Sequence, residues 1–114
     1  MDKIAKIQKL LNEAQKELNK FKTSNNEVFL YQASEKVWMS YVLLIELMTK
    51  KELRSRKEIG LYSWKLIGKS MILRDLYYKA NVLHQYHYEG RLDTRFVVEH
   101  INYCLKYIRM YLEK

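Results

Sequence analysis

The sequence predicts an all-α protein, an up-and-down bundle of four to five antiparallel helices. Apolar residues recur at spacings of three and four along the chain, as they do on one face of a helix. No segment alternates between apolar and polar residues as a half-buried strand would. The chain has no proline and only three glycines, so little interrupts helices. Its 114 residues fit one domain, residues 1–114.

The first two helices are expected in the N-terminal half. The apolar stripe of the first covers about residues 2–21. The polar segment 22–26 breaks this pattern, and Ser24 followed three residues later by Glu27 predicts a capping box at the start of the second helix. That helix is expected to end near Lys51. Its apolar stripe is wide, which favours a central position with more than one neighbouring helix.

The third helix is expected to begin near Arg56, after a second capping box formed by Ser55 and Glu58. Its apolar positions include Trp64. The segment 68–73 opens with a glycine, which weakens a helix by up to about 1 kcal/mol relative to alanine. We therefore expect a kink or break there.

Two more helices complete the predicted bundle. The fourth is expected over about residues 73–88, and Gly90 suits the left-handed position that ends many helices. Asp93 is expected to cap the last helix, with Leu92 packing on Val97 across that cap. The core face of the last helix is expected to contain Val97, Ile101, Cys104, Leu105, Ile108 and Leu112.

The composition is typical of a globular protein, with 48% hydrophobic and 30% charged residues. No apolar run approaches the roughly 18 residues that a membrane-spanning helix needs. The N-terminus alternates charges and does not resemble a secretory signal, so we expect a cytoplasmic protein without a membrane partner. Cys104 is the single cysteine, which excludes an internal disulfide. It lies on an apolar face and is expected to be buried and inert.

The net charge of +8 favours anionic partners such as RNA or DNA, although this composition also suits a heat-adapted, thermophile protein. Tyr62 and Trp64 lie among the densest cations, as stacking aromatics do in single-stranded RNA binders. In the alternative, which we favour from the sequence, Trp64 is a core residue and the cations lie on a solvated helix face. The candidate nucleic-acid-binding residues are Lys50, Lys51, Arg54, Arg56, Lys57, Lys65, Lys69 and Arg74.

The histidines give no metal motif. His84 and His87 share one helical face, but no set of further ligands at a recognised spacing accompanies them. We therefore predict no metal and no cofactor. The two rings are expected to pack against tyrosines as structural residues. An interface or ligand-binding role for His84, His87 and Tyr88 stays open.

Three segments, taken in order, resemble a known family. They are Gln32-Ala-Ser-Glu-Lys-Val-Trp38, Ala80-x-x-Leu-His84 and Tyr88-Glu-Gly-x-Leu-Asp93. Together they are similar to the HEPN superfamily, and most to its archaeal repeat-family branch (crenarchaeal, PaREP-type), over about residues 10–112. The resemblance implies a helical bundle that often dimerises and acts in toxin–antitoxin or defence systems, often with a small nucleotidyltransferase. Active members are metal-independent ribonucleases.

The ribonuclease motif of that family, an arginine and a polar residue followed by a histidine, is poorly matched. His84 falls where the family histidine would fall, but the arginine upstream of it, Arg74, is too distant in sequence. Arg95 and His100 have the literal spacing, with Phe96 in place of the polar residue. Five residues turn a helix by about 140° from one side chain to the other, so the pair does not share a face. We interpret this match as chance.

The preferred hypothesis is therefore a non-catalytic HEPN-like bundle that binds RNA or a partner protein and forms a homodimer. One alternative is a metal-independent ribonuclease toxin paired with a nucleotidyltransferase antitoxin. It would use Arg95 with His100, or Arg91 or Arg95 of one subunit with His84 of the other. A second alternative is a purely structural oligomeric partner of a nucleotidyltransferase.

Overall fold

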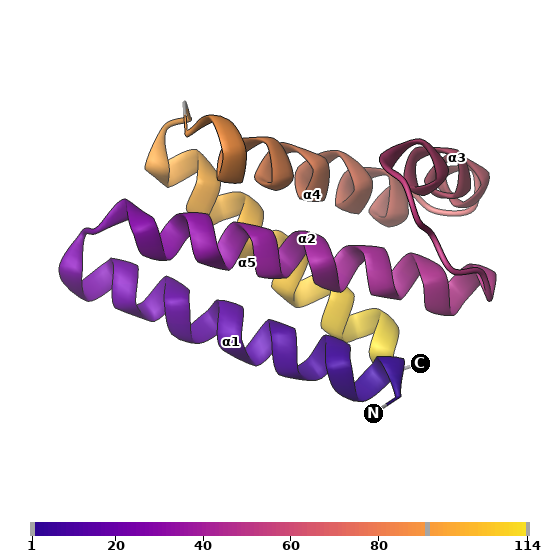
Figure 1. Ribbon diagram of the computed structural model, residues 1–114, viewed down its shortest axis with the longest axis horizontal. Coiled ribbons are helices and arrows are strands. Elements are labelled where there is room, and N and C mark those ends of the chain that lie inside the picture. Colours follow the sequence, from indigo (N-terminus) through magenta and orange to yellow (C-terminus); the bar gives the residue numbers. More distant parts are fainter. Residues whose placement is uncertain (1, 91, 114) are drawn as a thin grey trace.

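The computed structural model describes residues 2–90 and 92–113, and this part of the chain forms five helices and no strand (Figure 1). The predicted all-α bundle is confirmed. No helix in the described ranges is long and apolar enough to cross a membrane. The helices are α1 (Lys3–Ser24), α2 (Glu27–Thr49), α3 (Arg56–Ile67), α4 (Met71–Glu89) and α5 (Thr94–Leu112).

Helix α2 is the central element of the bundle, as its wide apolar stripe predicts. It contacts all four other helices and packs most extensively against α1. Figure 1 shows α1, α2 and α4 side by side, with α5 crossing behind them and α3 across the end of α4. One face of the α1–α2–α4 layer is thus covered by α5, and no helix within residues 2–90 and 92–113 covers the opposite face.

The core lies where the apolar stripes of these helices meet. Each long helix contributes residues at the expected spacings of three and four, such as Leu11 and Leu18 from α1. The residues of α2 in this core include two aromatic rings, Trp38 and Tyr41, both less than 9% exposed. The α4 and α5 stripes close the core with Leu76, Ala80, Leu83, Val97, Ile101, Cys104, Leu105 and Ile108.

The start of α2 differs from its prediction. Ser24 is the last residue of α1, and its hydroxyl donates to the carbonyl of Lys20 at 2.7 Å. Asn25 follows in the left-handed conformation, with φ 57°, which asparagine tolerates better than most residues. The cap therefore passes to Asn26, whose Oδ1 accepts from the Val28 amide at 3.0 Å. The predicted Ser24–Glu27 capping box is wrong for this reason.

The other predicted helix ends agree more closely. The Glu58 amide donates to the Ser55 hydroxyl at 3.2 Å at the start of α3. Gly90 ends α4 with φ 64°, and Asp93 caps α5 by accepting from the amide two residues later at 2.8 Å. The expected break after α3 is present, but Ser70 caps α4 and starts it earlier than predicted.

Candidate nucleic-acid interface

The predicted basic residues gather at one end of the bundle. They come from the end of α2, the connection to α3, α3 itself and the start of α4, which lie together on the right in Figure 1. We call these eight residues the basic end. All of them are exposed: Lys50, Lys51, Arg54, Arg56, Lys57, Lys65, Lys69 and Arg74.

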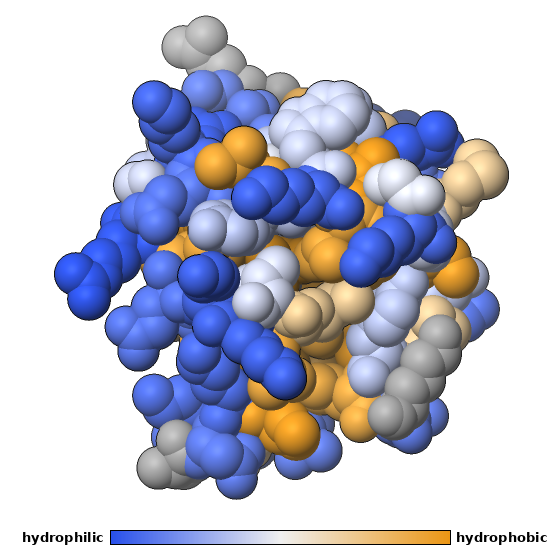
Figure 2. All heavy atoms as spheres, turned by 90° about the vertical axis from the view of Figure 1, so that its right-hand side faces the viewer, coloured by the Kyte–Doolittle hydropathy of each residue, from blue (hydrophilic) through white to orange (hydrophobic). Residues whose placement is uncertain are grey.

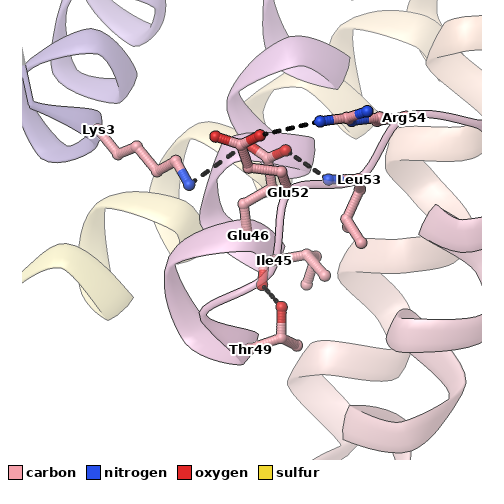
Figure 3. A network of polar contacts seen from close by, with 7 residues as sticks. All are labelled: Lys3, Ile45, Glu46, Thr49, Glu52, Leu53 and Arg54. Carbon is pink, nitrogen blue, oxygen red and sulfur yellow. Dashed lines mark hydrogen bonds and ion pairs between the residues drawn. The ribbon is translucent and has the colours of Figure 1, made fainter.

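A buried carboxylate holds the connection between α2 and α3, which carries three residues of the basic end, Lys50, Lys51 and Arg54. Glu46 is 9% exposed, and its Oε2 accepts from the Leu53 amide at 2.7 Å (Figure 3). Its other oxygen lies 3.8 Å from the Lys3 ammonium on α1. The segment between α2 and α3 is thus bound to the bundle at Leu53. The cations on either side of Leu53 lie at the surface, where Arg54 pairs with Glu52 at 3.8 Å.

Helix α3 docks through a small polar and apolar stripe. The buried residues of the helix are Ile59, Ser63 and Leu66. Ser63 is 1% exposed, and its hydroxyl lies 2.6 Å from the phenol oxygen of Tyr41 on α2. Burial raises the pKa of Tyr41, so the phenol stays protonated, and either of the two hydroxyls can donate to the other.

Trp64 follows Ser63 and therefore faces outward. It is 61% exposed, so the expectation that it belongs to the core is wrong. Successive residues on a helix point about 100° apart, and the hydrogen bond of Ser63 with Tyr41 gives the inward position to the serine. A hydroxyl that satisfies a buried phenol is not visible in the spacing of apolar residues. For that reason the sequence pattern assigned the larger ring to the core.

Most cations of the basic end are available to an anionic ligand. Arg74 pairs with Asp75 at 3.5 Å, and Arg56 donates to the side chain of Asn81 at 2.9 Å. Lys65 lies 4.6 Å from the centre of the Tyr62 ring. Within the described ranges, the four remaining lysines have no acidic partner within 4 Å: Lys50, Lys51, Lys57 and Lys69.

Apolar and aromatic side chains lie among these cations. Trp64 is joined on α3 by Leu61, which is 54% exposed, and at the start of α4 by Met71, which is 68% exposed. Figure 2 looks onto this end of the molecule and shows hydrophobic side chains between hydrophilic ones. A surface that combines unpaired ammonium groups with an exposed indole ring can contact phosphates and stack on a base.

The predicted histidine cluster is a structural seam between α2 and α4. The His84 Nδ1 donates to the Glu35 carboxylate at 3.1 Å, and its ring stacks on Trp38 with centres 4.6 Å apart. The His87 Nδ1 donates to a backbone carbonyl of α2 at 2.9 Å. Tyr88 packs edge-on against both rings and is 72% exposed. Of the three residues proposed for an interface or ligand, only the tyrosine is open to solvent.

No group of three or more histidine, cysteine or acidic side chains that could hold a metal occurs in residues 2–90 and 92–113. Cys104 is fully buried in α5, and burial raises the pKa of its thiol to about 12. A thiol in that environment stays protonated and is a poor nucleophile. The expectation of a buried cysteine is confirmed.

The weak catalytic candidates have separate partners. The Arg95 guanidinium is 91% exposed and lies 3.5 Å from Asp93. The His100 Nδ1 donates to the carbonyl of Phe96 at 3.0 Å, and the two rings lie 4.0 Å apart. Burial, followed by the nearby Lys79 ammonium, lowers the pKa of His100. His84 is engaged with α2, as described above, and Arg91 lies outside the described residues.

A groove that the sequence pattern did not predict runs between α1 and α2. Its volume is about 750 Å³, and Ile59 of α3 contributes to its lining. Lys6 and Lys9 of α1 line the groove. Glu35, whose carboxylate accepts from His84, lines it as well. Its apolar lining is Leu10, Trp38, Met39, Val42, Leu43 and Ile59. These residues come from three helices, so only the packing of those helices reveals the groove.

Comparison with family models, with curated proteins and with solved structures found no match to the chain. The resemblance to the HEPN superfamily therefore stays a prediction. Any function has to be argued from the residues and their arrangement.

Proposed function

We propose that the protein binds single-stranded RNA at its basic end, with Trp64 as a stacking residue. The observation that carries this proposal is the 61% exposure of an indole ring in the densest run of cations on the chain. A tryptophan at the surface of a small bundle leaves a large apolar face in water, which favours a partner that covers it. A nucleic-acid base covers such a ring, and the lysines around it suit the phosphates on either side.

At such a site the free energies of stacking and of phosphate contacts add, and the selectivity for sequence is weak. Each base that stacks on an aromatic side chain contributes about 1–3 kcal/mol, whatever its identity. The phosphate contacts act by releasing counterions, so the affinity falls as salt rises. We therefore expect binding to single strands with little preference for sequence.

The two tryptophans of the chain provide the test. Trp64 is 61% exposed and Trp38 is 6% exposed, so their fluorescence reports on different environments. In a Trp38→Phe variant, emission comes from the ring at the basic end, and titration with single-stranded RNA is expected to quench it. In the matched Trp64→Phe variant, the remaining indole lies in the core and is expected to change little. Emission of Trp38→Phe that stays constant while RNA is added at low salt would contradict the proposal.

We propose further that this binding is not coupled to cleavage, as expected for a non-catalytic member of a HEPN-like family in a toxin–antitoxin or defence setting. Metal-independent cleavage needs a cation and a histidine together on one surface. Here Arg95 pairs with Asp93, and His84 donates to Glu35. Incubation of the pure protein with single-stranded RNA and a chelator tests this. Cleavage that disappears in a His84→Ala or His100→Ala variant would support the ribonuclease alternative instead.

The groove supports a second function, self-association or partner binding. Helix α2 has the most apolar composition of the five helices, and a helix that is apolar on all sides is normally covered on all sides. α1, α4 and α5 cover it on three sides, whereas Met39 in the groove is 45% exposed. We propose that a second copy of the chain covers this face. A nucleotidyltransferase in place of that copy is the alternative.

A further inference from the structure

A row of aromatic side chains follows one side of α5, beside its core stripe. The residues are spaced by four, three, four and four, which keeps them on one stripe of the helix. At a rise of 1.5 Å per residue, this aromatic row is about 22 Å long. The rings of Tyr103 and Tyr107 lie 4.5 Å apart. The row consists of Phe96, His100, Tyr103, Tyr107 and Tyr111.

Two lysines accompany the row. The Lys79 ammonium on α4 lies 4.8 Å from the centre of the Tyr103 ring, and the Lys106 ammonium on α5 lies 5.2 Å from that of Tyr107. Within residues 2–90 and 92–113, neither lysine has an acidic side chain within 4 Å. Two carboxylates act on the row from a greater distance: Asp75, after burial, raises the pKa of Tyr103, and Glu99 opposes the lowered pKa of His100. Asp75 itself pairs with Arg74.

The row leads to the basic end. Its last phenol oxygen, on Tyr111, lies 3.2 Å from the hydroxyl of Ser70, the N-cap of α4. Lys69 and Met71 flank that serine, and Lys65 lies one helical turn earlier on α3. In Figure 1 the end of α5 and the start of α4 lie at the same end of the bundle as α3. The aromatic row thus meets the basic end at Ser70, between Lys69 and Met71.

We propose that the aromatic row extends the RNA site, so that successive bases of one single strand stack on Trp64 and then on Tyr107 and Tyr103. Lys79 and Lys106 supply phosphate contacts along that path. A separate stripe of α5 fills the core, and Tyr103, Tyr107 and Tyr111 pack against the edge of that core while keeping part of their surface exposed. Tyr103 and Tyr107 are partly exposed and lie beside cations, which is the arrangement that stacking tracks for single strands share. This inference rests on the proposed function and assigns a longer binding path to it.

Two lengths of RNA test the path. Fluorescence anisotropy would compare a labelled oligonucleotide of about 5 nucleotides, which can occupy the basic end alone, with one of about 15 nucleotides. The double variant Tyr103→Leu/Tyr107→Leu is expected to weaken binding of the longer strand about 10-fold or more and to leave the shorter one unchanged. Tyr103→Phe/Tyr107→Phe is the matched control, since it keeps both rings and is expected to bind as the unaltered protein does. Circular dichroism of each variant checks the fold.

A second pair of substitutions makes the test independent of packing. Lys79→Gln/Lys106→Gln leaves both rings in place and is expected to weaken the longer strand about 3-fold or more at low salt. If the short strand binds and the long strand gains nothing from Tyr103, Tyr107 or the lysines, the aromatic row is not part of the site and the inference is wrong. If neither strand binds, the proposed function fails as well, which separates the two failures.

Discussion

Ser63 determines which side of α3 faces the bundle. Its hydroxyl is the only buried partner that the described residues give the Tyr41 phenol, and the pair links α3 to the central helix. A phenol buried without a partner costs about 1–3 kcal/mol. The consequence for the surface is indirect, because the inward serine turns Trp64 outward. The buried position of Ser63 therefore accounts for the exposed position of Trp64, the next residue in the helix.

A double-mutant cycle tests this pair. Ser63→Ala is expected to lower the free energy of unfolding by about 1–3 kcal/mol, since it leaves the Tyr41 hydroxyl without a partner. Tyr41→Phe/Ser63→Ala removes both polar groups and is expected to cost less than the sum of the two single changes. Urea denaturation gives all four values. Strictly additive losses would show that the two hydroxyls are not coupled.

His100 predicts a dependence of stability on pH. Burial and then the positive charge of Lys79 lower its pKa in the folded protein, while the hydrogen bond to the Phe96 carbonyl and then Glu99 oppose the shift more weakly. The unfolded chain therefore takes up a proton at a higher pH than the folded one. The free energy of unfolding should fall as the pH drops through the unfolded pKa of 6.5, and should have fallen fully below the folded pKa.

The comparison with His100→Gln isolates this group. Melting temperatures measured between about pH 8 and pH 5 should decline more steeply for the unaltered protein than for the variant, because glutamine does not titrate. The other ionisable groups are the same in both proteins and cancel in the difference. Parallel curves would mean that the proton of His100 is not linked to folding.

At the scale of the helix, the basic end acts as a set of separate charges. Lys51, Lys57 and Lys69 are exposed and have no acidic partner within the described ranges, so each is expected to neutralise one phosphate. Replacing all three by glutamine should weaken RNA binding and reduce the slope of log affinity against log salt by about 2, at about 0.7 per phosphate for single strands.

The control for these charges lies at the far end of α1. Lys16, Lys20 and Lys22 are exposed, and their replacement by glutamine changes the net charge by the same amount. Anisotropy titrations at several salt concentrations should give these variants the slope of the unaltered protein. Equal effects of the two triple variants would assign the binding to overall charge and not to the basic end.

Helix boundaries show how far local sequence rules reach. Gly90 was predictable from its residue type, because the position after α4 needs a positive φ. A second reason for glycine at this position could not be predicted from local sequence. A Cβ there would lie 2.8 Å from the hydroxyl of Tyr31, which belongs to another helix. Likewise, Ser24 and Asn26 are both good caps, and only the left-handed Asn25 between them decides which one is used.

At the scale of the whole molecule, the sequence predicted the bundle and its basic residues, but not the groove or the contact between α5 and the start of α4. The stripes of α1 and α5 identify core residues such as Leu18 and Ile108, since burial repeats with the helical period. The groove along Met39 depends on which face of α2 the other helices leave open. The link from Tyr111 to Ser70 joins residues 41 apart in sequence. Neither feature has a local sequence signal.

Self-association through the groove is the prediction for the assembled molecule. Light scattering at micromolar concentration is expected to give the mass of a dimer. Met39→Glu places a charge in the apolar groove and should give a monomer. Val28→Glu, on the same helix, equally exposed and absent from the groove lining, should stay dimeric. A monomeric mass for the unaltered protein would contradict self-association and would favour a different partner for the exposed face of α2.

Few contacts hold α3 to the bundle, and this determines how readily the helix opens by itself. Three buried side chains, the Ser63–Tyr41 pair and the contact of Arg56 with Asn81 hold this helix to the bundle. The α1–α2 hairpin, in contrast, packs along its whole length. Opening of α3 alone therefore costs less than global unfolding, and its amides should exchange with deuterium before those of α2. The helix that presents Trp64 is thus able to detach and return while the rest of the bundle stays folded.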